Sequence, residues 1–219
     1  TDYRAADSER IKNSQFEDRQ TSGSLGLKLT RRHSLEGKFQ YFKVVDAGLP
    51  GGASFPTKAV VTYPTTSRLL ADVSWVWRPR THWIEESKLS TYYQPVERNV
   101  KIIPNAPSTT QAHPQDTSKT IRLTPQLITP GADHNVYGAR WQNIIRTGSH
   151  TIVSGIEGWQ KHMLSDRTKY IRREIIDTTT GEAIGDPTEV IIKETPVPDS
   201  RQMPIGIFAE DSFRIGGRT

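Results

Sequence analysis

Alternation between apolar and polar positions is strongest over residues 68–78. Leu69, Ala71, Val73, Trp75 and Trp77 fall on one side of an extended chain. A period of two is typical of a strand with one apolar face. Pro79 ends the pattern, because proline cannot donate a ladder hydrogen bond. The pattern predicts a strand whose tryptophans either pack in a core or contact a ligand.

Similar short patterns recur along most of the chain. They predict further strands over residues 25–30, 39–45, 60–63, 120–123, 126–129, 150–156, 170–177, 189–193 and 205–208. Thr-Gly and Gly-Asp-Pro turn signals between residues 177 and 188 predict that the flanking strands form a hairpin. Residues 135–146 are ambiguous, since Trp141, Ile144 and Ile145 also fit one face of a short helix.

Three segments differ from this strand pattern. Residues 1–24 are mostly polar and predict an N-terminal arm. Residues 104–118 contain three prolines and predict a long loop. Residues 195–219 predict a C-terminal extension, so the folded domain is expected over residues 25–194.

The spacing of about ten strand candidates predicts an all-β fold. We expect an antiparallel two-sheet sandwich, resembling a jelly roll, with extended arms at both ends. An open barrel is the alternative architecture.

Composition limits the classes of function. The 219 residues include no cysteine, which excludes disulfides, thiolate catalysis and cysteine-ligated metals. The formal net charge of +5 is spread along the chain without a run of five basic residues, so it only weakly indicates a polyanionic partner. No stretch approaches 18 consecutive apolar residues and no signal peptide is visible, so we expect no membrane span.

No catalytic constellation is visible. The six histidines lack metal-ligand spacing. Asp133-His134 and Ser149-His150 are sequence neighbours, whereas a triad requires convergence in space. Adjacent Glu85 and Glu86 would point to opposite faces of a strand. We therefore predict a protein that is not an enzyme and that uses no cofactor and no metal.

Arginines lie close in sequence to tryptophans at several positions. Surfaces that bind phosphates and stack bases or sugars have this composition. The candidate nucleic-acid or ligand contacts are Arg31, Arg32, Arg68, Arg78, Arg80, Trp83 and Arg140.

The combined features favour a structural assembly protein, most plausibly a capsid or coat component located in a virion or assembled particle. Its expected partners are other copies of itself or other subunits, and nucleic acid as a further partner. The alternatives are a carbohydrate- or ligand-binding β-sandwich module and an uncharacterised enzyme on a β fold.

Overall fold

The computed structural model describes residues 3–4, 6–7, 9–50 and 59–214. These residues contain ten strands, and none of them lies in a helix long and apolar enough to cross a membrane. The strands are β1 (Glu17–Lys28), β2 (His33–Leu49), β3 (Val60–Trp77), β4 (Ile84–Ile103), β5 (Thr109–Ala112), β6 (Lys119–Thr147), β7 (His150–Asp177), β8 (Thr188–Glu194), β9 (Ser200–Gln202) and β10 (Ile205–Phe213).

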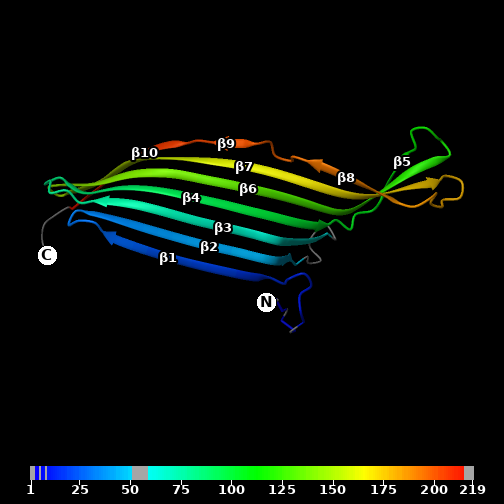
Figure 1. Ribbon diagram of the computed structural model, residues 1–219, viewed down its shortest axis with the longest axis horizontal. Coiled ribbons are helices and arrows are strands. Elements are labelled where there is room, and N and C mark those ends of the chain that lie inside the picture. The colour runs from blue at the N-terminus through cyan, green and yellow to red at the C-terminus, as the bar shows by residue number, and fades with distance from the viewer. Residues whose placement is uncertain (1–2, 5, 8, 51–58, 215–219) are drawn as a thin grey trace.

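All ten strands belong to one antiparallel sheet with the order β1-β2-β3-β4-β6-β7-β10 (Figure 1). β5 pairs with β6, and β8, β9 and β10 follow one another along the outer side of β7. The central strands are long, with 29 residues in β6 and 28 in β7. A strand averages about 5–6 residues in globular proteins, so these lengths are unusual.

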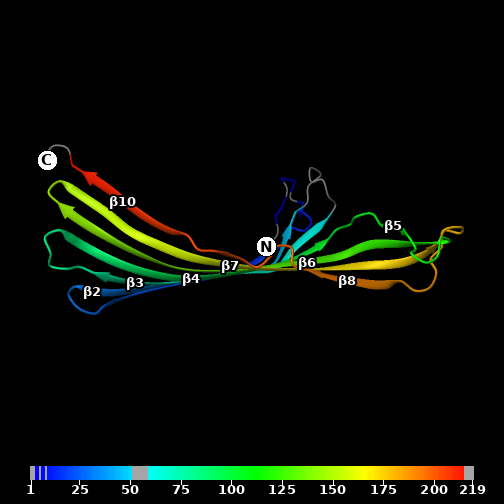
Figure 2. The same cartoon turned by 90° about the horizontal axis from the view of Figure 1, so that it is seen from above.

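The all-β, antiparallel prediction is confirmed, but the two-sheet sandwich is not. The described residues form a single sheet, and seen from above it is one curved layer (Figure 2). The physical reason is that alternation tells which side chains share a face. It does not tell what covers that face.

Two local predictions can be compared directly with the strands. The hairpin prediction is confirmed, because β7 and β8 pair antiparallel from Arg173↔Thr188 to Arg167↔Glu194. The ambiguous segment 135–146 is strand throughout, inside β6. Its pairing on both sides, with β4 and with β7, outweighs the weak helical spacing.

The predicted arm and extension both contribute strands. β1 begins at Glu17, so the predicted arm 1–24 includes part of an edge strand. Before β1, Ser14 is buried and the Asn13 amide donates to the carbonyls of Leu49 and Val61, both at 2.8 Å. The predicted extension 195–219 contains β9 and β10, while its residues 215–219 lie outside the described residues.

The connections differ in length at the two ends of the sheet. Leu29–Arg32, Arg78–Trp83 and Gly148–Ser149 are short and meet at one end, which we call the turn end. The connections at residues 104–118 and 178–187 lie at the other end, where β2 also ends and β3 begins, and which we call the loop end (Figure 1).

Candidate functional site

One face of the sheet is lined by large apolar side chains, and we call it the apolar face. Its clearest feature is a row of directly paired residues, one from each of seven neighbouring strands. This apolar row consists of Leu27, Leu35, Trp75, Leu89, Trp141, Ile156 and Ile207. Every position in the row is apolar, although its members come from segments spread over the 181 residues from Leu27 to Ile207.

The adjacent row on the opposite face has no large apolar residue. This polar row consists of Gly26, Glu36, Ser74, Ser90, Arg140, Glu157 and Gly206. The opposite face also carries apolar side chains such as Leu70, Val76 and Trp159, but these are more covered than those of the apolar face. The sheet is therefore amphipathic in the period of two that strands impose.

Within the described part of the chain, the side chains of the apolar face are largely exposed. Trp75 is 38% exposed, Trp141 is 51% exposed and Ile207 is 84% exposed. Among the described residues, only Val76, Val100, Ile121 and Ile176 are buried hydrophobic residues. Contiguous apolar patches of more than a few hundred Å² are rare on water-exposed monomers, so this face indicates a contact with something apolar.

Two aromatic side chains on this face have hydrogen-bond partners inside the sheet for their polar atoms. The Trp141 indole N–H donates to Ser87 Oγ at 2.9 Å. The Tyr93 hydroxyl donates to Asn135 Oδ1 at 3.1 Å. Because these groups are satisfied within the chain, an apolar partner would leave neither of them without a hydrogen bond.

From β1 to β6 the apolar face ends toward the loop end. The next rows on the same face lead to a mostly charged row in direct register, formed by Arg19, Lys43, Ser67, Glu97 and Asp133, which is followed on β7 by the exposed Leu164. Tyr93 and its paired neighbour Tyr137 lie two rows before this margin. An aromatic ring whose polar tip points toward a charged margin suits the boundary between an apolar medium and water.

On β3 the apolar positions extend from Leu69 to Trp77, which is nine residues. At about 3.3 Å per residue the eight steps cover roughly 26 Å along the strand. A strand of about 9–11 tilted residues crosses the hydrocarbon core of a bilayer, so the length matches.

The opposite face is organised by polar contacts. Lys88 Nζ lies 3.2 Å from Glu36, and the hydroxyls of Ser74 and Ser90 are 2.8 Å apart. The guanidinium of Arg140 stacks 4.6 Å from the ring centroid of Phe208. Burial, together with the carboxylate of Glu157, raises the pKa of the Tyr92 hydroxyl.

Five of the seven sequence-predicted contact residues converge at the turn end. Arg31 and Arg32 lie in the β1–β2 turn, and Arg78, Arg80 and Trp83 lie in the β3–β4 connection. These two connections touch through a backbone hydrogen bond of 2.8 Å from Arg78 N to Arg32 O. The guanidinium group of Arg78 forms an ion pair with the Glu86 carboxylate at 2.7 Å.

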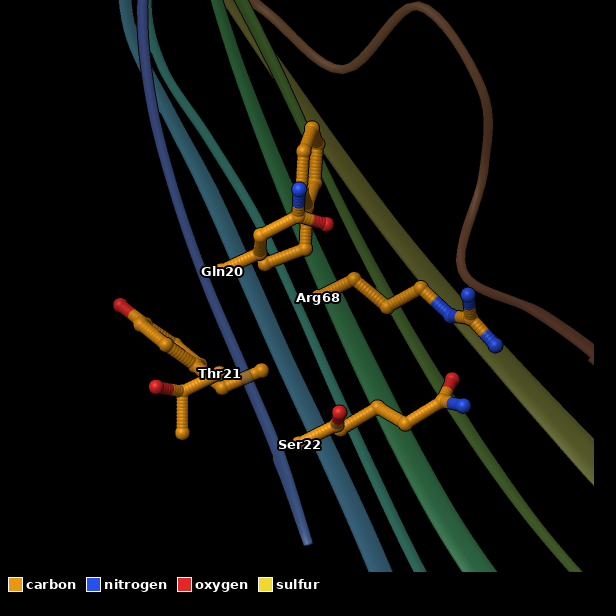
Figure 3. A pocket seen from close by; sticks show the side chains of 7 residues that line it. Gln20, Thr21, Ser22 and Arg68 are labelled. Carbon is orange, nitrogen blue, oxygen red and sulfur yellow. The ribbon is translucent and has the colours of Figure 1, made fainter.

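The other two predicted residues lie elsewhere, within strands on the opposite face. Arg140 belongs to the polar row, and Arg68 donates to Gln94 Oε1 at 3.1 Å. Arg68 borders an open hollow of about 320 Å³, lined also by Gln20, Thr21, Ser22, Gln40, Tyr41 and Phe42. Figure 3 shows Arg68 and Thr21 projecting to opposite sides of the strands, so the residues around the hollow come from both faces.

Sequence reasoning found the alternation in β3 but missed the apolar face as a site. The missing signal was the register, since Leu27, Leu89 and Ile207 become neighbours of Trp75 and Trp141 only after the strands pair. Among the described residues, no three His, Asp or Glu side chains gather in a way that could hold a metal ion.

No family model matches the chain, and no curated protein matches its sequence.

Proposed function

We propose that the sheet of this chain spans a lipid bilayer, with its apolar face against lipid hydrocarbon and its opposite face toward water. We call this arrangement the membrane wall. The carrying observation is the contrast between the apolar row and the polar row, which are neighbouring residues on each of the seven strands β1, β2, β3, β4, β6, β7 and β10. In hydrocarbon, every backbone group must be hydrogen-bonded internally, and the interior strands of a continuous sheet satisfy this condition.

The width of the apolar face supports lipid as its occupant. The face is continuous over seven strands, and it is bounded on the same side by charged residues at about the depth where a bilayer's polar region would begin. Short turns at one end and longer loops at the other are the usual asymmetry of membrane-spanning strands.

The expectation of no membrane span was based on continuous apolar runs. A strand presents only every second side chain to lipid, so its membrane-facing residues never form such a run. On β3, for example, Ser74 and Asp72 interrupt the apolar residues in sequence but lie on the other face.

Tryptophan fluorescence in lipid vesicles tests this proposal. Variants that keep a single tryptophan, either Trp75 or Trp141, should be strongly quenched by lipids brominated on the acyl chain. A variant keeping only Trp159, which projects from the opposite face, is the matched control and should be quenched much less. Equal quenching at Trp75 and Trp159, or none at either, would rule the proposal out.

A second candidate is the self-associating structural protein expected from the sequence. The observation that favours it is the outer edge of β1, where eleven of twelve residues are exposed. Unpaired edge strands are templates for pairing with another chain. If a second copy also covered the apolar face, the pair would form the two-sheet sandwich predicted from the sequence.

Size measurement by light scattering distinguishes the two candidates. A lipid-facing protein should need detergent to stay dispersed and should have the same protein mass over a range of concentrations. A protein whose apolar face is covered by a second copy should form a defined oligomer without detergent. The coat, nucleic-acid and carbohydrate-binding interpretations stay predictions, as does the absence of enzymatic activity.

A further inference from the structure

Basic side chains gather at the turn end of the sheet, directly beyond the apolar face. They are Lys28, Arg31, Arg32, Arg78, Arg80, Lys88, Arg146 and Arg214, against the acidic Glu85, Glu86, Glu210 and Asp211. This count, eight basic against four acidic residues, leaves a local excess of four positive charges, while the whole chain has +5. Most of the net charge therefore lies at one end of the molecule.

Three of the acidic residues at this end are already engaged. Glu86 pairs with Arg78 at 2.7 Å, Glu85 pairs with Arg146 at 2.6 Å, and Asp211 accepts from His150 at 2.7 Å. Within the described part of the chain, no acidic side chain pairs with Arg31, Arg32 or Arg80. These three guanidinium groups are available to an external anion.

The backbone that carries these arginines is held in place. In the first turn, Thr30 Oγ1 accepts from the backbone N–H groups of Arg32 and His33, both at 3.1 Å. In the second connection, Thr81 Oγ1 accepts from the Ile84 N–H at 3.2 Å. The bond from Arg78 N to Arg32 O joins the two segments, so cations from two turns share one site.

Exposed apolar side chains lie among these cations. Trp83 is 55% exposed and Leu29 is 55% exposed, on the same two connections. The nearby backbone N–H of Arg146 donates to the Trp83 carbonyl at 2.8 Å, which fixes the residue at the end of the sheet. A tryptophan next to arginines at the limit of an apolar band is the composition of a membrane–water interface.

We propose that Arg31, Arg32, Arg80 and Trp83 form a collar that binds the phosphodiester headgroups of anionic phospholipids. This inference depends on the proposed function, because it places the turn end at the headgroup level when the apolar face is in hydrocarbon. Guanidinium groups bind phosphate oxygens through paired N–H donors, and Trp83 lies in the interfacial layer.

The position of the collar favours lipid over nucleic acid. A nucleic-acid strand needs a track of cations along its backbone, and Arg68 and Arg140 lie away from the turn end on the opposite face. The collar arginines instead form a short group at the rim of an apolar surface, where headgroup phosphates lie in a bilayer.

Vesicle binding tests the collar. The full chain is mixed with vesicles of phosphatidylcholine alone or of phosphatidylcholine with phosphatidylglycerol, and the bound fraction is measured by flotation. The chain should bind the anionic vesicles more tightly, and the triple variant Arg31→Gln, Arg32→Gln, Arg80→Gln should lose about a hundredfold of that preference. The matched control, Arg122→Gln, Arg173→Gln, Lys193→Gln, removes the same charge near the loop end and should keep the preference.

Quenching of Trp75 by brominated lipid, read in the same samples, separates the two proposals. If the chain inserts into both kinds of vesicle without preferring the anionic one, the proposal that the collar binds anionic headgroups is wrong. The proposal of the membrane wall is then unaffected. No quenching in either vesicle overturns the membrane wall, and with it the collar. Loss of the anionic preference on adding a single-stranded oligonucleotide, together with tight oligonucleotide binding by the collar, overturns the lipid assignment in favour of nucleic acid.

Discussion

Ser74 and Trp75 are consecutive residues on β3, and the polar residue is buried while the apolar one is exposed. The serine is 2% exposed and shares a hydrogen bond of 2.8 Å with Ser90, while the tryptophan beside it is 38% exposed. In a protein surrounded by water, the large ring would be the buried member of such a pair. Leu89 and Ser90 on β4 show the same order, since Leu89 is 42% exposed and Ser90 is half-buried. An apolar medium around the sheet accounts for both pairs.

Replacing Val73 with arginine places a charge at the midpoint of the apolar positions on β3, between Leu69 and Trp77. On a lipid face at mid-depth this should cost about 2–4 kcal/mol of folding free energy in bilayers. Urea titration of vesicle-folded protein measures the change. Gln40→Arg on the opposite face is the control and should cost much less, and equal costs for the two variants would contradict the account.

Replacing Ser74 with alanine removes a hydroxyl that is covered on the opposite face. The lost hydrogen bond with Ser90 should destabilise the fold by about 1 kcal/mol. Thr91→Ala removes a hydroxyl from the apolar face and should be neutral or slightly stabilising there. The same denaturation assay compares them. If Thr91→Ala is the more damaging change, the two faces have been assigned the wrong way round.

Stability should fall as the pH drops below the ordinary pKa of histidine because of His134. Burial lowers the pKa of His134, and the cations Lys161 and Arg98 lower it further against the opposing effect of Asp133. The unfolded chain then takes up the proton first, so stability is complete above about pH 6.5 and decreases below it. The His134→Gln variant should flatten this part of the pH–stability curve, and an unchanged curve would exclude His134 as the cause.

Pairing of β8 with β7 should weaken in acid through Glu194. Hydrogen bonds from Lys169 and Arg167 hold the pKa of Glu194 below its ordinary value of 4.5. The stabilisation is therefore present above pH 4.5 and is lost as the pH falls through the lower, folded-state pKa. The protection factors of the Val190 and Ile192 amides, which compare each exchange rate with that of an unstructured peptide at the same pH, should fall in acid. Glu194→Gln should give the lower protection already at neutral pH. Protection factors that stay constant in acid in the unmodified chain would contradict this.

Much of the strand content could be predicted from the sequence. The alternation over 68–78 identified β3, and the turn signals after Asp177 identified the β7–β8 hairpin. Predicted strands were too short elsewhere, because β6 and β7 continue through Pro125, Pro130 and several glycines. Neighbouring strands on both sides stabilise these residues in extended form, and no local pattern reports that support.

The site could be predicted only in part. Arg31, Arg32, Arg80 and Trp83 were singled out by residue type, but their convergence depends on the meeting of two turns. Arg68 and Arg140 were grouped with them although β3 and β6 hold them on the opposite face. The apolar row required the register of six strand pairs, which composition and periodicity do not contain.

Spin-label accessibility along β3 tests the central claim most directly. The chain has no cysteine, so single-cysteine variants from Leu69 to Val76 can each carry one label in lipid vesicles. The membrane wall predicts that odd-numbered positions are accessible to oxygen dissolved in the bilayer and that even-numbered positions are shielded from it. Uniform accessibility to a water-soluble relaxation agent at the odd-numbered positions would contradict the claim.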